Sequence, residues 1–346
     1  MPDSLKLTRE QEQRALDIHR KSIFVNICDT THIRNFENSY VQKLIEGGVT
    51  SVVVTCFAYE ENFSSAIRNT NLWQMKGLCL DGTFVATTAE SIQKAKGEGK
   101  LAIVLGSQNT EQIENDLPNL NIFHKLGLRI MGLTYQRKNP MGDGLGEKTN
   151  CGLSKLGVQV VEELNRLGIL IDLSHSGVAT TMEAMQISKD PVIFSHANAR
   201  SLCDNIRNLT DEQMKALSEN GGTIGILALS PFLSNRAAQT GSTMEDYLNQ
   251  IDYVRDLVGV DHVSIGLDLG EASKPEDFLR LRLRYPEFPL LDEFKRKGIY
   301  APKELENATT LSAITKGLVT RGYSDEEIQR VLGKNALRVF RDVWGE

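Results

Sequence analysis

Short apolar runs rich in β-branched residues recur along the chain, and a segment long enough to form a helix follows each of them. Two of these segments, residues 155–169 and 211–222, place apolar residues at helical spacing and end near glycine. Regular alternation of strand and helix is typical of parallel βαβ units, and eight such units close a barrel. The pattern predicts a (β/α)8 TIM barrel. We expect its strands at residues 23–28, 51–57, 101–106, 130–135, 170–175, 191–196, 223–229 and 262–268.

Helical patterns also extend beyond both ends of the predicted barrel. Residues 1–20 form a charged helix pattern, and residues 304–346 read as helices packed on the barrel. Within that last segment Ser324 and Glu327 have the spacing of a capping box. We therefore predict a single domain over residues 1–346, because one large barrel with end helices accounts for the whole length.

Three long connections follow predicted strands. Residues 58–80 and 136–152 are insertions after the second and fourth strands, and residues 271–303 follow the eighth. Loops that follow barrel strands lie at the active-site face. We expect the first two insertions to form lids or walls of a substrate pocket, the second because it is rich in turn-forming Gly and Asn.

Composition narrows the class of partner. The net charge is −6, and no cluster of Lys and Arg stands beside aromatic residues, which argues against nucleic acid. No run of about 18 apolar residues and no export signal is present, so we expect a cytoplasmic protein without a membrane span. Five widely spaced cysteines without a CxxC pair indicate reduced thiols. A small-molecule substrate is the expected partner.

Chemistry-bearing residues close three of the predicted strands. His175 and His196 end the fifth and sixth runs, and Asp268 ends the eighth. Side chains at the carboxyl ends of barrel strands converge on one mouth. Imidazole and carboxylate groups there suit a metal site or general acid–base catalysis. From the two histidines alone, however, a structural role with hydrogen bonds to neighbouring backbone is the favoured interpretation.

At these strand ends the sequence resembles the renal (membrane) dipeptidase family, peptidase family M19, within the amidohydrolase-like metal barrels. The resemblance covers most of the chain. Five blocks carry it in the family's order: residues 165–177, 191–200, 206–213, 262–270 and 322–344.

The resemblance implies an activity and a set of site residues. The family cleaves dipeptides with two zinc ions joined by a glutamate. By that resemblance His175 and His196 are ligands of the second zinc, Arg207 binds the substrate carboxylate, and Asp268 is the acid or base. It also implies a homodimer.

Three positions depart from the family pattern. Ile27 stands where the first-strand His-x-Asp pair has its histidine, although Asp29 retains the aspartate. Gln108 replaces the bridging glutamate, and Tyr135 replaces a histidine beside the substrate. A branch of the family shares these Gln108 and Tyr135 blocks, so we assign Gln108 and Tyr135 to substrate binding and Tyr135 also to catalysis.

Strand alternation at the first strand predicts that Ile27 and Asp29 face the mouth and that Cys28 points to the helices. Loss of the bridging carboxylate disfavours two adjacent dications. We therefore expect one zinc ion, held by His175, His196 and Asp29. The expected function is metal-assisted hydrolysis of a small amide or dipeptide-like substrate that bears a carboxylate.

Two alternatives remain open at this point. The first is a metal-free acid–base enzyme that acts on a modified substrate such as an N-methylated amino acid. The second is a non-catalytic binding protein that retains the barrel pocket.

Overall fold

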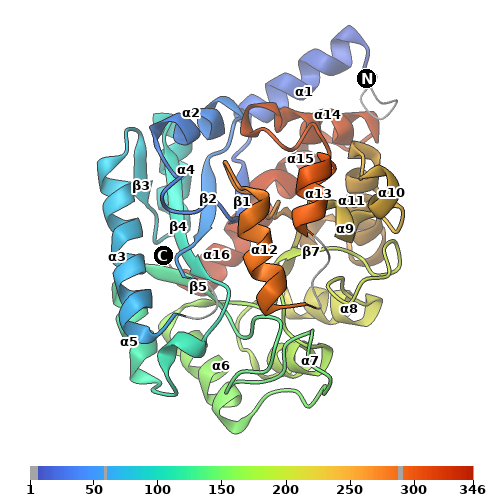
Figure 1. Ribbon diagram of the computed structural model, residues 1–346. Helices are drawn as coiled ribbons and strands as arrows, with labels where there is room; N and C mark the ends of the chain where they lie inside the picture. Colours follow the sequence, from blue (N-terminus) through green and yellow to red (C-terminus); the bar gives the residue numbers. More distant parts are fainter. Residues whose placement is uncertain (1–6, 58–60, 287–290, 346) are drawn as a thin grey trace.

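The computed structural model describes residues 7–57, 61–286 and 291–345. Eight parallel strands close into a barrel, with helices around it (Figure 1). Closure is completed where β1 pairs with both β2 and β9, and where β2 pairs with β4. In hydrogen-bonded order the barrel strands are β1 (Val25–Asp29), β2 (Ser51–Thr55), β4 (Leu101–Ser107), β5 (Leu128–Gly132), β6 (Leu170–Asp172), β7 (Ile193–Ala197), β8 (Thr223–Ile226) and β9 (Val263–Ile265). The predicted barrel and its eight strands are confirmed.

One strand was not predicted. The short strand β3 (Thr83–Val85) pairs with the first half of β4, whereas β5 pairs with the second half. Three residues are too few to show an alternating pattern, so the sequence gives little sign of this strand.

Helices form an outer layer and cover both ends of the barrel. They are α1 (Arg9–Lys21), α2 (Asn38–Glu46), α3 (Phe63–Cys79), α4 (Ala89–Glu98), α5 (Pro118–Lys125), α6 (Lys155–Leu167), α7 (Val178–Ile187), α8 (Asp211–Asn220), α9 (Ser230–Leu233), α10 (Ala237–Thr240), α11 (Met244–Val258), α12 (Pro275–Arg284), α13 (Leu291–Lys297), α14 (Ser312–Thr320), α15 (Asp325–Gln329) and α16 (Asn335–Trp344). The predicted capping box at Ser324 and Glu327 is present at the start of α15. A π-helical turn (Arg330–Lys334) joins α15 to α16.

Helix α16 closes the end of the barrel opposite the mouth. Its Leu337 and Phe340 are buried with the interior side chains of β1, β4 and β5. The amide of Asn335 donates to the carbonyls of Val260 and Val263 at the start of β9, both at 2.7 Å. This end of the barrel is therefore filled by packing, which leaves the carboxyl ends of the strands for chemistry.

The predicted insertions differ in their structure. Residues 63–79 form α3, which packs against β3 and β4 in the outer layer, so the expectation of a lid there was wrong. Residues 58–60 lie outside the described part. Residues 136–152 form a loop held to the strand ends by a bridge between Gly144 and Ser176. In the part of the chain that the structure describes, no helix is long and apolar enough to cross a membrane.

Candidate active site

The structure brings His175, His196 and Arg207 together at the mouth of the barrel. His196 lies on β7, and His175 lies three residues beyond the end of β6. Their Nε2 atoms are 2.9 Å apart. Arg207 Nη2 donates to the carbonyl of His196 at 2.6 Å and lies 3.4 Å from His175 Nε2. All three side chains are buried.

Hydrogen bonds on the far side of the His196 ring determine its tautomer. Ser195 Oγ donates its one proton to the carboxylate of Asp172. Ser195 Oγ therefore accepts from His196 Nδ1–H, at 2.7 Å. The Asp172 carboxylate is held in place because it also accepts from the backbone N–H groups of Ser174 and Ser195, at 3.0 and 2.9 Å. His196 Nε2 consequently presents a lone pair to the site.

His175 is oriented in the same way. Its Nδ1–H donates to Gln136 Oε1 at 2.8 Å, which leaves Nε2 unprotonated. The ring of Tyr135 stacks on the imidazole, with centroids 4.3 Å apart. Burial, and then the positive charge of Arg207, lower the pKa of His175 and His196 well below the usual value, so both rings are neutral.

Backbone strain is concentrated around this group. His175, Gln136 and Asp268 have φ angles of 70°, 58° and 55°. Such left-handed conformations cost about 1–3 kcal/mol for a non-glycine residue and occur preferentially at functional sites. The strain turns His175 and Asp268 toward the mouth beyond the ends of β6 and β9.

Asp268 lies half-buried beside a thiol that the sequence analysis set aside. Its Oδ1 lies 3.7 Å from Cys28 Sγ. Burial raises the pKa of Asp268 to about 7, and the positive charge of Arg207 opposes that shift. Gln108 is half-buried at the same place, and its Nε2 lies 3.2 Å from Thr55 Oγ1 and 3.7 Å from Cys28 Sγ.

The prediction that Asp29 faces the mouth and Cys28 faces the helices was wrong. The register between β1 and β2 shifts between Asn26 and Asp29. Such a bulge reverses the side-chain alternation that follows it. The Asp29 carboxylate instead accepts from Tyr40 Oη of α2 at 2.6 Å and from the backbone N–H of Thr31 at 2.9 Å. The Asp29 carboxylate therefore does not join the group of Cys28, His196 and Asp268 side chains at the mouth.

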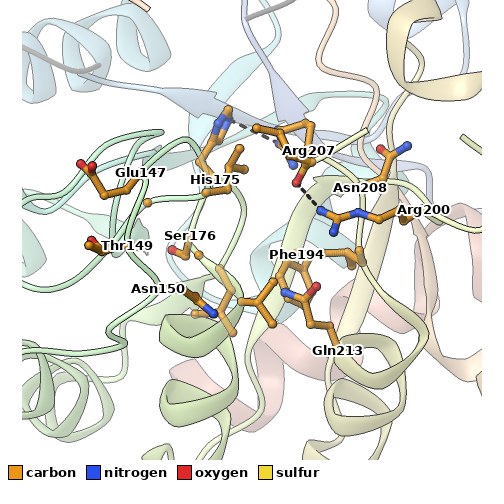
Figure 2. A pocket seen from close by; sticks show the side chains of 17 residues that line it. Glu147, Thr149, Asn150, His175, Ser176, Phe194, Arg200, Arg207, Asn208 and Gln213 are labelled. Carbon is orange, nitrogen blue, oxygen red and sulfur yellow. Dashed lines mark hydrogen bonds between the residues drawn. The ribbon is translucent and has the colours of Figure 1, made fainter. Parts of the chain in front are cut away.

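A cavity of about 160 Å³ opens beside His175 (Figure 2). His175 and Arg207 line it together with Arg200, which donates to the carbonyls of Asn205 and Ile206. From the loop predicted to form a wall, Gly144, Leu145, Glu147, Thr149 and Asn150 also line the cavity. Its use as a substrate pocket stays a prediction.

Several residues of the site were missed from sequence. Asp172 and Ser195 lie within the predicted strands LIDLSH and PVIFSH, and a polar residue inside an apolar strand run is the signal that could have found them, because it needs a hydrogen-bond partner when buried. Gln136 gives no such signal, because its contact with His175 depends on how the 136–152 loop folds back. Tyr285 follows α12 and packs edge-on against Tyr135, at 5.5 Å.

The sequence as a whole matches one family model. The model for membrane dipeptidase (peptidase family M19) matches residues 12–299 and 293–344. The chain belongs to this family. It is 28% identical over 333 residues to dipeptidase 3 of Homo sapiens and 27% identical over 305 residues to dipeptidase tcpJ of Claviceps purpurea (strain 20.1).

Coverage differs between the curated relatives and the solved structures. The match to dipeptidase 3 covers 92% of this chain but 62% of that protein, and for the Claviceps purpurea dipeptidase the shares are 85% and 65%. The chain thus spans less than two thirds of the length of these relatives. A crystal structure of an amidohydrolase from Pseudomonas aeruginosa superposes with a TM-score of 0.88 and 28% identity, covering 96% of this chain and 99% of that one.

Proposed function

We propose that the protein is a dipeptidase-like hydrolase that uses one divalent metal ion, zinc, to cleave a small amide or dipeptide-like substrate bearing a carboxylate. The observation that carries this proposal is the approach of two unprotonated imidazole nitrogens, His175 Nε2 and His196 Nε2, to 2.9 Å. Arg207 Nη2 lies 3.4 Å from one of these nitrogens, and a divalent metal ion bound to both nitrogens would engage both lone pairs. Neutral imidazole nitrogens that face one another in this way are ligands that zinc commonly uses.

The geometry agrees with this assignment. Two imidazole nitrogens bound to one zinc at about 2.0–2.1 Å and at a tetrahedral angle lie about 3.3 Å apart. The observed 2.9 Å needs only a small opening of the pair. The hydrogen bonds to Gln136 and Ser195 are the outer contacts that orient ligating histidines and fix their tautomers. Such a metal ion supplies Lewis-acid polarisation of a carbonyl and acidifies water.

The protein's own residues supply the remaining functions. Asp268 lies within reach of the same position and accepts the proton of the attacking water, then returns it to the leaving amine. Arg207 presents a guanidinium to the adjoining cavity, where its fork suits a carboxylate. Tyr135 and Gln108 border the substrate site. Tyr135 also keeps the His175 ring in place by stacking on it.

The size of the cavity supports a small substrate. At about 160 Å³ it lies below the roughly 300–1,000 Å³ of typical ligand pockets. The matches to dipeptidases, which span only part of those proteins, favour the same substrate class.

The test is metal analysis of protein purified without added metal or chelator, followed by dipeptide hydrolysis assays before and after chelation. We expect one equivalent of zinc, and loss of both metal and turnover in His175→Ala and His196→Ala. Turnover that persists in metal-free protein would instead favour metal-free acid–base chemistry on a modified amino acid. Ligand binding without turnover or metal would favour a binding protein.

A further inference from the structure

The mouth of the barrel contains a buried thiol whose position is set by the β1 bulge. Cys28 Sγ, a ring nitrogen of His196 and a carboxylate oxygen of Asp268 all lie within 4.8 Å of one another. Among the described residues this is the one group of three or more His, Cys, Asp and Glu side chains that is close enough to hold a metal ion. His175 adjoins the group through its 2.9 Å approach to His196.

The spacing within the group is that of metal ligands. A thiolate sulfur at about 2.3 Å and an oxygen or nitrogen at about 2.0 Å from one zinc ion are about 3.5 Å apart at a tetrahedral angle. Cys28 Sγ lies within 4.8 Å of a ring nitrogen of His196, so small side-chain movements bring the sulfur and the nitrogen to this spacing.

Charge gives a second, independent reason. A dication in a buried site needs anionic ligands, and two candidates for that role are absent from the mouth. Asp29 is turned toward Tyr40, and Gln108 carries no charge. A thiolate at Cys28 restores one negative charge beside the histidines, and Asp268 then remains free to accept a proton.

We propose that Cys28 is a thiolate ligand of the metal ion at His196, so that the site selects a borderline or soft divalent cation (Zn²⁺, Co²⁺ or Cd²⁺) over Mg²⁺ or Mn²⁺. This inference rests on the proposed single-metal site. On binding, the S–H bond breaks, the S–metal bond forms, and the proton is released to solvent. Thiolate ligands favour these cations, whereas carboxylate and water ligands favour the harder ones.

The first experiment uses the unmodified chain. X-ray absorption at the zinc edge of the stoichiometric zinc protein is expected to show one sulfur at about 2.3 Å together with nitrogen and oxygen ligands. One equivalent of Cd²⁺ added to metal-free protein is expected to produce a thiolate-to-cadmium charge-transfer band in the ultraviolet.

Two serine variants then identify the cysteine that supplies the sulfur ligand. Cys28→Ser is expected to lose the charge-transfer band and to bind Zn²⁺ about 100-fold more weakly or worse, with a larger loss for Cd²⁺ than for Mn²⁺. Cys56→Ser is the matched control, because Cys56 is equally buried just after the next strand but packs among apolar side chains of the main core cluster. It is expected to retain both band and affinity.

The outcomes separate the two proposals. The role of Cys28 is overturned if the bound zinc has nitrogen and oxygen ligands only, or if the cadmium charge-transfer band persists in Cys28→Ser. Either result leaves the proposal of a single-metal hydrolase unaffected. A folded chain that binds no divalent cation overturns both. If Cys28→Ser does not fold, the X-ray absorption spectrum of the unmodified chain still decides.

Discussion

The contact between Asp29 and Tyr40 distinguishes a structural aspartate from a metal ligand. Tyr40 Oη donates to the buried carboxylate at 2.6 Å, and the Thr31 N–H donates to its other oxygen at 2.9 Å. Hydrogen bonds to a charged group contribute about 1.5–3 kcal/mol, and more is lost when a buried partner is left unpaired. We therefore expect Tyr40→Phe to lower the free energy of unfolding by about 1.5–3 kcal/mol. Asp29→Asn removes the charge from the same contact and should lower it by a comparable amount.

Urea denaturation followed by tryptophan fluorescence measures this effect close to its source. Trp73 packs edge-on against Phe36, with centroids 5.1 Å apart, and Phe36 packs against Tyr40. In the double variant the two losses should be less than additive by about 1–2 kcal/mol, since the residues share one contact. Metal content should be unchanged in Asp29→Asn. If that variant loses its metal while Tyr40→Phe unfolds like the unmodified chain, the outward position of Asp29 is wrong.

Three further predictions concern catalysis, substrate charge and pH. Asp268→Asn should keep its metal and lower kcat by about 10²–10⁴-fold, as measured by dipeptide hydrolysis, because a general base is lost; an unaltered kcat would exclude that role. Arg207→Met should weaken binding of α-carboxylate ligands by about 2–4 kcal/mol in thermal-shift titrations. Arg207→Lys retains the positive charge but not the forked guanidinium. If amidated analogues bind the unmodified chain as well as α-carboxylates do, Arg207 does not bind a substrate carboxylate. Burial of His19, which bonds Thr315 and Gly47, lowers its pKa, so the unfolded chain takes up the proton first. Stability should then fall as pH drops below about 6.5, by up to about 1.4 kcal/mol per pH unit for this one group. His19→Gln should flatten that slope in pH-dependent urea unfolding.

The barrel was predictable because its signal is local and repeated. Eight apolar runs of similar length, separated by helical segments, specify strand number and direction without any knowledge of contacts. The histidines and Asp268 were predictable for the same reason, since strand ends converge in a barrel. Strand β3 was missed because it is only three residues long. Residues 58–80 were taken for a lid because they follow a predicted strand, although most of them form α3, which begins after the Asn62 cap.

The predicted facing of Cys28 and Asp29 in β1 was wrong for a different reason. Alternation assigns a face to every residue of a strand, and one extra residue reverses all assignments beyond it. The bulge between Asn26 and Asp29 depends on how β1 fits between β2 and β9, which is a property of the closed sheet and not of the five residues in β1. The resemblance to the family reinforced the error, because it aligned Asp29 with a ligand.

The charges at the mouth determine how many dications it can hold. Asp172 already satisfies its carboxylate with Ser174 and Ser195, and Asp29 does so with Tyr40 and Thr31. That leaves the carboxylate of Asp268 and the thiol of Cys28, while the buried Arg207 adds a positive charge.

Two adjacent dications in this space would repel each other with too little negative charge to offset the repulsion, whereas one dication is balanced by a carboxylate and a thiolate. The proposed single-metal site is also compatible with Gln108. A neutral amide suffices where no second metal ion has to be bridged, and restoring a carboxylate there in Gln108→Glu should favour a second metal ion only if another anionic ligand turns inward with it.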